Sequence, residues 1–413
     1  MAFDHHSEEY AKHWAEQTAE MRAQCPVAHS DAHGGYWVVT GYEEALAVAL
    51  DTDTFSQGRV DGESSYFVPS TPYALIPLEL DPPLQTQMRR ILNPIFTDRM
   101  ANEWVSYVTD VADVHIDAFI ERGEADLQVE LARRVTAIVN LALVGITGLE
   151  DVDAFIDAPG IMVRAERGSP EFQAAFELTQ RVEKRMKAEL LKRRAEPRAD
   201  VLSVVAAMQF DDERADDDLL LRLVNTIVAG GNSTTTSLIA FSLQWLSEHP
   251  DARAELAADP ERLEVALEEF LRLSSPALVG GRRATADVEV AGQAIQAGDM
   301  LLVSWAGANR DPAVYPDPDE AHFDRDNSRH FAFGWGRHRC LGRSFARMMA
   351  LTVLRRVLER LPDYHVDVDR IERYPRVPVV NGVLTLPATF TPGKPIGAEM
   401  PSETPPLPDK VAL

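Results

Sequence analysis

The strongest constraint on the fold is a helical pattern of apolar residues that dominates from about residue 101 to residue 274. Pro197 and Pro250 bracket the middle of this region, and no proline lies between them. Asp216-Asp217-Asp218 supplies negative charge where a helix can begin, and the pattern after it predicts a helix of about thirty residues. Shorter strand patterns follow at 287–290, 294–304, 364–369 and 382–390. We therefore predict a mainly α protein with small β-sheets.

The rest of the chain adds a few elements around this region. Residues 8–24 and 43–49 predict helices, and 36–40 predict a strand, whereas 57–80 and 306–339 are long irregular stretches. Helical periodicity returns at 343–360. No linker divides residues 8–390, so we predict one domain over residues 1–391. The tail at 392–413 is rich in Pro, Glu and Ser, and we expect it to be mobile or draped on the surface.

Composition narrows the class of protein. The 413 residues contain no apolar run of 18 or more, which predicts no membrane span. The start of the chain is polar and acidic, unlike a signal or transit peptide. Two cysteines in so long a chain indicate a reducing compartment, and we expect a cytoplasmic protein. A formal net charge of -24 argues against nucleic acid and anionic membranes as partners.

One of the two cysteines, Cys340, stands in a run rich in glycine and basic residues, Phe333-Gly-Trp-Gly-Arg-His-Arg-Cys-Leu-Gly342. A helical pattern starts immediately after it, so the thiol has local positive charge and a helix N-terminus beside it. Both features favour a thiolate. No second cysteine is nearby, which argues against a zinc site or a disulfide. A buried, inert cysteine is the simpler alternative.

The run matches every fixed position of the pattern Phe-Gly-x-Gly-x-His-x-Cys-x-Gly, and it resembles the haem-ligand loop of the cytochrome P450 monooxygenases. The resemblance implies haem b (iron protoporphyrin IX) with the Cys340 thiolate as axial metal ligand, and Phe333 and Gly342 beside it. It also implies the P450 fold, a triangular prism-like single domain. There, haem lies between the long helix and the helix after Cys340.

Further motifs of this family occur in the expected order. Glu269-x-x-Arg272 is similar to the family's buried ion pair, which Arg325 would complete as a structural triad. Gln85 and Arg89 lie on one face of a predicted helix and, with Arg282 and His338, would donate to the two haem carboxylates. Bacterial members usually have histidine where this chain has Gln85.

The long helix carries Gly230-Gly-Asn232-Ser233-Thr234, where the family has an acid followed by threonine for proton delivery. One alignment puts Thr234 at the alcohol position and Ser233 at the acid position; a shift of one residue gives Ser233 and Asn232 instead. Neither alignment places a carboxylate at the acid position. Clustered hydroxyls beside two glycines can also open a helix, so Ser233 and Thr234 could simply satisfy a kink.

By family position, an apolar substrate pocket is expected from eight residues. They are Tyr66, Phe67, Val68, Gly230, Leu278, Val279, Val383 and Leu384. Each of these residues except Gly230 is also an ordinary candidate for the hydrophobic core.

The implied reaction inserts one oxygen atom from O₂ into a small-to-medium apolar organic substrate. There is no Gly-x-Gly-x-x-Gly after a strand and no cysteine cluster, so we expect no fused flavin or iron–sulfur segment and electrons from a ferredoxin and its reductase. Basic residues around Cys340 predict the docking site of that acidic partner, at Arg339, Arg343 and Arg347. Two alternatives remain at this point: a peroxide-driven haem peroxygenase and a non-catalytic haem-fold binder.

Overall fold

The computed structural model describes residues 3–70, 74–147 and 168–407, together with Val152, Ala158 and Ile161. The chain divides into two compact units, each made of three stretches. The first unit is Met1–Arg89, Val265–Leu341 and Pro375–Asn381; the second is Arg90–Glu264, Gly342–Tyr374 and Gly382–Leu413. Our single domain over residues 1–391 stays a prediction.

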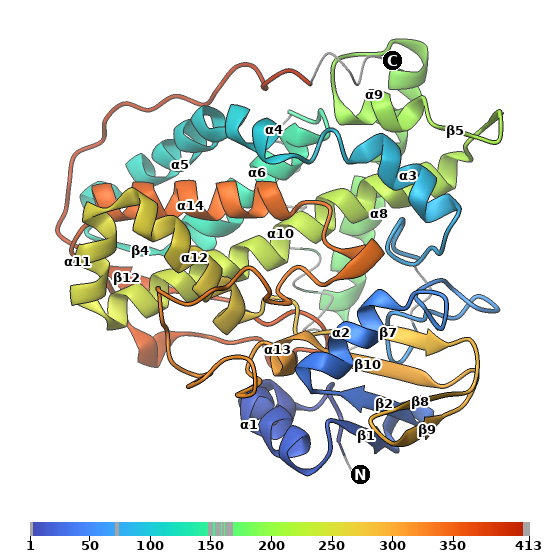
Figure 1. The fold of residues 1–413 in the computed structure, drawn as a ribbon. Helices are drawn as coiled ribbons and strands as arrows, with labels where there is room; N and C mark the ends of the chain where they lie inside the picture. The colour runs from blue at the N-terminus through green and yellow to red at the C-terminus, as the bar shows by residue number, and fades with distance from the viewer. Residues whose placement is uncertain are drawn as a thin grey trace. The chain divides into compact units, whose positions relative to one another are not determined.

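A five-stranded sheet forms the centre of the first unit, in the order β1-β2-β10-β7-β3. The β2–β10 pair is parallel and the other pairs are antiparallel. Figure 1 shows α2 against this sheet, where it contacts β10. The strands of this unit are β1 (Val27–Ser30), β2 (Tyr36–Val39), β3 (Phe55–Ser56), β7 (Val279–Ala284) and β10 (Met300–Ser304), with the separate hairpin β8 (Val288–Val290) and β9 (Gln293–Ile295).

The helices of the first unit pack aromatic side chains around that sheet. Trp305 stacks on Phe331, with ring centroids 5.6 Å apart, and Tyr42 meets Phe331 edge-on. This core fixes the segment that leads into the cysteine run. The helical elements are α1 (Glu8–Gln24), the 3₁₀ turn η1 (Ala32–Gly34), α2 (Tyr42–Leu50), α13 (Trp305–Ala308) and η5 (Gly336–His338); α3 (Leu84–Leu92) and α12 (Pro260–Ser274) run from one unit into the other.

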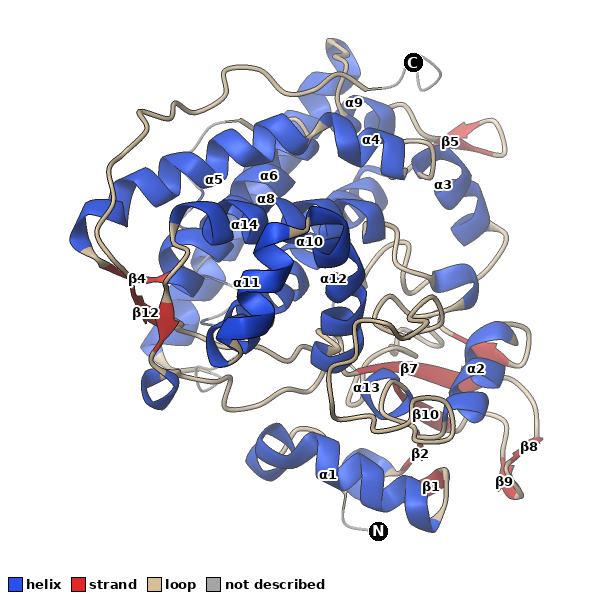
Figure 2. Ribbon diagram, turned by 60° about the vertical axis from the view of Figure 1, so that its left-hand side comes forward, coloured by secondary structure: helices blue, strands red, loops and turns tan. Residues whose placement is uncertain are grey.

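The second unit is predominantly helical, and α10 (Asp217–Glu248) is its longest helix. Figure 2 shows these helices, among which α10 contacts α6, α8 and α14. Asp216 caps α10 by accepting from the N–H groups of Asp218 and Leu219. The other elements are α4 (Asp98–Glu103), α5 (Val105–Phe119), η2 (Ile120–Arg122), β4 (Glu124–Asp126), the π-helical segment η3 (Leu127–Ala132), α6 (Arg133–Leu143), α8 (Pro170–Ala195), α9 (Val201–Ala206), β5 (Gln209–Phe210), β6 (Glu213–Arg214), α11 (Pro250–Ala258), α14 (Arg343–Arg360), β11 (His365–Val366), η6 (Val368–Arg370) and β12 (Pro387–Thr389).

The prediction of a mainly helical protein with small sheets is confirmed. The helices expected at 8–24 and 343–360 have those bounds, and the long helix follows Asp216. The strand expected at 294–304 is two strands, because Gly298 turns the chain with a φ of 94°. None of the described helices carries an apolar stretch long enough to cross a bilayer.

The beginning of the tail is tethered to the second unit. The Asp117 carboxylate accepts from the backbone N–H groups of Ile396, Gly397 and Ala398, and from Arg360. Several charge-assisted hydrogen bonds to one carboxylate order a segment that has no secondary structure of its own. Around residues 396–398 the tail is therefore draped on the surface.

Candidate functional site

The cysteine run folds into a tight loop that depends on its glycines. Gly334 and Gly336 have φ values of 62° and 70°, in the left-handed region that favours glycine. A Cβ on Gly336 would lie 2.4 Å from the carbonyl oxygen of Ala49. Within the loop the Cys340 N–H donates to the Phe333 carbonyl at 2.8 Å. The backbone of the loop therefore helps to fix where the thiol is presented, and helix α14 starts three residues later.

Beside this loop lies a buried arginine that forms no ion pair with any carboxylate in the described chain. Arg282, on β7, is 2% exposed, and its Nη1 donates to the Gly281 carbonyl at 2.7 Å. Its Nε has no hydrogen-bond partner among the described residues. Burial lowers the pKa of Arg282 to about 10, so the guanidinium stays charged at neutral pH. A buried cation of this kind is costly unless an anion binds to it.

His338 lies in the same charged surroundings. Its Nε2 is buried and finds no partner among the residues that the structure describes. The pKa of His338 is lowered to about 3, first by burial and then by the charges of Arg282, Arg89 and Arg337. Three cations therefore act on one neutral imidazole, which is the electrostatic setting of an anion site.

The residues around Cys340 provide the groups that a haem needs. Its two carboxylates need donors and positive charge, and the orphaned donors at Arg282 and His338 supply both. A Cβ on Gly342 would meet nothing within 4 Å, so the backbone after Cys340 is open on that side. The residues present therefore fit the cofactor that the sequence predicts.

The Gln85 amide holds the cysteine loop directly. Its Nε2 donates to the carbonyl of Arg337 at 2.9 Å, and the side chain is 2% exposed. Arg89 lies one turn further along α3, on the same face. Because an amide carries two N–H groups, Gln85 keeps one more donor besides the bond to the loop. A neutral residue at this position thus positions the loop without adding charge.

A close backbone contact places the loop around Tyr66 next to β7. The Gly281 N–H donates to the Tyr66 carbonyl at 3.0 Å, and a Cβ on Gly281 would lie 2.5 Å from that oxygen. The pKa of Tyr66 is raised to about 12, by burial first, and charges at Arg282 and Cys340 also act on it. Three of the predicted residues, Tyr66, Arg282 and Cys340, are therefore neighbours.

The structure brings Glu269, Arg272 and Arg325 together. Arg272 donates to both carboxylate oxygens of Glu269, at 2.8 and 2.7 Å, and both side chains are 0% exposed. Arg325 approaches the same carboxylate at 3.4 Å. Arg272 also donates to the carbonyl of Asn309, whose side-chain oxygen accepts from the N–H of Phe331. This chain of bonds runs from the ion pair to the cysteine loop, since the Gly334 N–H donates to the Phe331 carbonyl.

In the second unit, α10 is helical throughout the stretch that the sequence suggested could open. The Thr234 hydroxyl donates to the Gly230 carbonyl at 2.8 Å, and Asn232 Oδ1 accepts from Thr136 on α6 at 3.0 Å. Ala229 and Gly230 are exposed although the second half of the helix is buried. Asn232 is thus held by α6, whereas the Thr234 hydroxyl bonds within its own helix.

The turn at Gly382 packs against α10, the helix that carries Ser233. A Cβ on Gly382 would lie 2.5 Å from the Ser237 hydroxyl, which itself donates to the Ser233 carbonyl. The next residue, Val383, is held by its carbonyl, which accepts from Gln128 at 2.9 Å. Val383 and Leu384 therefore follow a turn packed on the helix that carries Ser233.

The chain also matches a known protein family. The family described as Cytochrome P450 matches residues 152–387, more than half of the chain. The chain belongs to the cytochrome P450 family. It is a P450 monooxygenase, an oxidoreductase that hydroxylates an organic substrate. The family binds haem through a cysteine thiolate.

Several characterised P450s resemble it over nearly their whole length. The steroid C26-monooxygenase of Mycolicibacterium smegmatis is 30% identical over 390 residues, 91% of this chain and 92% of the relative. The vitamin D(3) 25-hydroxylase of Pseudonocardia autotrophica is 31% identical over 381 residues, 91% and 93% of the two chains. Among solved structures, a mutant of P450 EryK in complex with erythromycin B has a TM-score of 0.83 and 26% identity, covering 95% of this chain and all of that one. The predicted P450 fold is confirmed.

Three contacts of the first unit are not predicted by the sequence. Gly281 lets the Tyr66 loop approach β7, Asn309 links Arg272 to the cysteine loop, and buried Glu79 accepts from Leu75 N–H at 2.7 Å and from Ser64. The Gly280-Gly281 pair before Arg282 was the available signal. Asn309 had none, because its partners Arg272 and Phe331 are 37 and 22 residues away in the sequence. Glu79 had none either, because no pattern in its irregular loop marks a buried carboxylate.

Proposed function

We propose that this P450 binds haem b with Cys340 as the axial ligand and hydroxylates an apolar substrate with electrons from a ferredoxin. The observation that carries the proposal is the pair of orphaned buried donors, Arg282 Nε and His338 Nε2, beside the loop that presents Cys340. When bound, haem supplies the activation of O₂. The chain's own residues fix the thiolate, neutralise the haem carboxylates and deliver protons.

Anion binding by Arg282 gives the first testable prediction. Replacing Arg282 with glutamine should speed haem loss by about 10- to 150-fold, because hydrogen bonds to charged groups are worth about 1.5–3 kcal/mol. Transfer of haem to a scavenging protein measures the rate. Arg283→Gln is the matched control, since Arg283 is the next residue on the same strand and bonds Gly298 and Glu63 instead. Equal rates for the two variants would contradict the assignment.

Thr234 is the residue we assign to proton delivery, with Ser233 and Asn232 as the adjacent polar groups. Its hydroxyl proton is engaged by the Gly230 carbonyl, but the oxygen can accept from water and relay a proton onward. Without a neighbouring carboxylate this transfer should be slow, and part of the reducing power should be lost as hydrogen peroxide.

Thr234→Ala should therefore lower the product formed per nicotinamide consumed several-fold and raise peroxide release. Thr226→Ala is the control, because Thr226 makes the same bond within α10, to the Arg222 carbonyl at 2.8 Å. If Thr234→Ala leaves the coupling unchanged, Thr234 has no part in proton delivery. Turnover with added peroxide that equals turnover with ferredoxin would favour the peroxygenase alternative instead.

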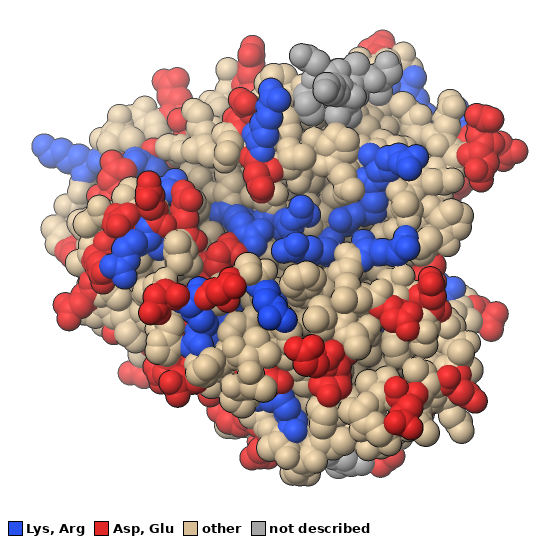
Figure 3. All heavy atoms as spheres, in the orientation of Figure 1, with Lys and Arg blue, Asp and Glu red and all other residues tan. Residues whose placement is uncertain are grey.

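A ferredoxin should dock at Arg339, Arg343 and Arg347. Acidic side chains are spread over the face shown in Figure 3, in keeping with the net charge of -24, so a basic site is locally distinct. Arg343 and Arg347 are one turn apart on α14, and Arg339 lies over the Trp335 ring at 5.2 Å. The positive charge of these arginines attracts an acidic partner and raises the rate at which the two proteins associate.

Arg347→Glu should slow reduction by ferredoxin by about tenfold at low salt, and added salt should diminish the difference. Stopped-flow reduction under carbon monoxide measures this rate. Arg370→Glu is the control, because it makes the same change of charge at an exposed arginine of η6. A reduction rate indifferent to salt and to Arg347→Glu would place docking elsewhere.

The substrate class rests on two predicted sets of pocket residues. They are Tyr66, Phe67, Val68, Leu278 and Val279 in the first unit, and Gly230, Val383 and Leu384 in the second. Relatives named for steroid and vitamin D3 oxidation make sterols and secosteroids the first compounds to test. A shift in the haem spin state on titration identifies binders. Binding confined to polar or charged compounds would overturn the apolar assignment.

A further inference from the structure

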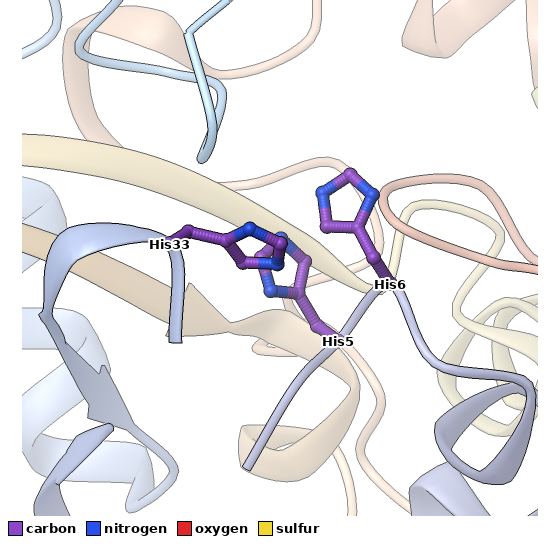
Figure 4. Close-up of side chains that lie close together, drawn as sticks. All are labelled: His5, His6 and His33. Atoms are coloured by element: carbon purple, nitrogen blue, oxygen red, sulfur yellow. The ribbon is translucent and has the colours of Figure 1, made fainter. Parts of the chain in front are cut away.

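Three histidines of the first unit form a cluster that P450 chemistry does not use. His5 and His6 precede α1, and His33 lies in the η1 turn between β1 and β2. One ring nitrogen from each histidine lies within 4.8 Å of those of the other two. Figure 4 shows the three rings gathered where the N-terminal segment meets this turn.

The rings are held in place by oxygen acceptors. His5 Nδ1 bonds the Tyr36 hydroxyl at 3.0 Å, His6 Nε2 bonds the Val68 carbonyl at 2.7 Å, and His33 Nε2 bonds Asp4 Oδ1 at 2.8 Å. Metal-binding histidines are typically oriented by such bonds to carboxylates and carbonyls. Because each imidazole has two nitrogens, either one can bind a metal while the other is held by the protein.

The charge next to the three rings suits the same use. Asp4, within hydrogen-bond distance of both His33 and the His6 N–H, adds a negative charge and an oxygen at the edge of the cluster.

We propose that His5, His6 and His33 bind one zinc ion, with a water oxygen as the fourth ligand. Three imidazoles and one oxygen form a common tetrahedral zinc set, in which neighbouring ligand nitrogens are about 3.4 Å apart. Starting from separations of up to 4.8 Å, modest side-chain rotations reach that geometry. Bound zinc would join the N-terminal segment to the β1–β2 turn.

The test uses the haem-loaded enzyme, produced without a histidine tag and stripped of adventitious metal with a chelator. Calorimetric titration with zinc sulfate should show one zinc per chain. The zinc absorption edge should report only nitrogen and oxygen ligands, and the thermal midpoint should rise when zinc binds. Failure to bind zinc, or sulfur ligands indicating Cys25 or Cys340, would overturn the proposal.

The variants avoid the buried His5, whose replacement risks the fold. His6→Gln with His33→Asn removes two ligands, and asparagine tolerates the positive φ of 52° at position 33. This double variant should bind zinc more than about a hundredfold more weakly. The loss in affinity should exceed the about 10- to 100-fold that follows removal of an outer-shell partner, because two direct ligands are removed. His13→Gln, at a side chain 51% exposed on α1, is the control and should bind zinc normally. Equal affinity in all three proteins would contradict the proposed site.

Discussion

Replacing Cys340 with serine is expected to abolish hydroxylation. The reduced, carbon monoxide-bound protein should also lose the red-shifted absorbance that a thiolate ligand produces. Serine is nearly isosteric, so the loop held by the Phe333 carbonyl and by the glycines should persist. The change therefore removes the soft, anionic ligand while leaving its position intact. The absorption difference spectrum and product analysis measure the two effects.

Cys25→Ser is the control for this experiment, because Cys25 is the second cysteine of the chain and its Sγ bonds the Val27 carbonyl. It should retain both the spectrum and the activity. A thiolate-type spectrum in the Cys340 variant, or its loss in the Cys25 variant, would refute the ligand assignment.

Glu269→Ala is expected to destabilise the protein by about 3–5 kcal/mol, because it leaves the fully buried Arg272 guanidinium without its carboxylate. Burial by itself would raise the pKa of Glu269, but hydrogen bonds from Arg272 and the His322 N–H hold it below its usual value. Domains typically have about 5–15 kcal/mol of stability, so the loss is a large share. Denaturant unfolding followed by circular dichroism measures it.

Glu264→Ala provides the comparison on the same helix, α12. Its partner Arg355 lies 2.8 Å away, but the two side chains are 57% and 38% exposed. An exposed pair of this kind contributes about 0.2–1 kcal/mol. Similar losses for the two variants would show that the Glu269 pair is not the buried anchor of the cysteine loop. Haem content should fall only in the Glu269 variant.

The long helices were predictable from the sequence because their signals are local. Asp216 caps α10 with its own side chain, and the apolar periodicity after it continues without proline. Short strands such as β3 and β7 were missed. Their pairing joins Phe55 to Ala284, and no local pattern records a partner so distant in the chain.

The candidate site shows the same division. Spacing within the run around Cys340 predicted the ligand loop, and the order of motifs identified Glu269, Arg272 and Arg325 as a set. Neither indicated that Gln85 would bond the Arg337 carbonyl. The histidine cluster was also invisible, because His5 and His33 come together only when the chain before α1 crosses the β1–β2 turn.

The sequence alone determined the family and the helices, and it singled out Cys340 as the predicted ligand, since each signal lies in residues close together along the chain. Only the tertiary structure decided which charges are buried without a partner, which hydroxyls are already engaged and which distant side chains meet. Those properties depend on burial and on contacts between remote segments, and a pattern of neighbouring residues does not contain them.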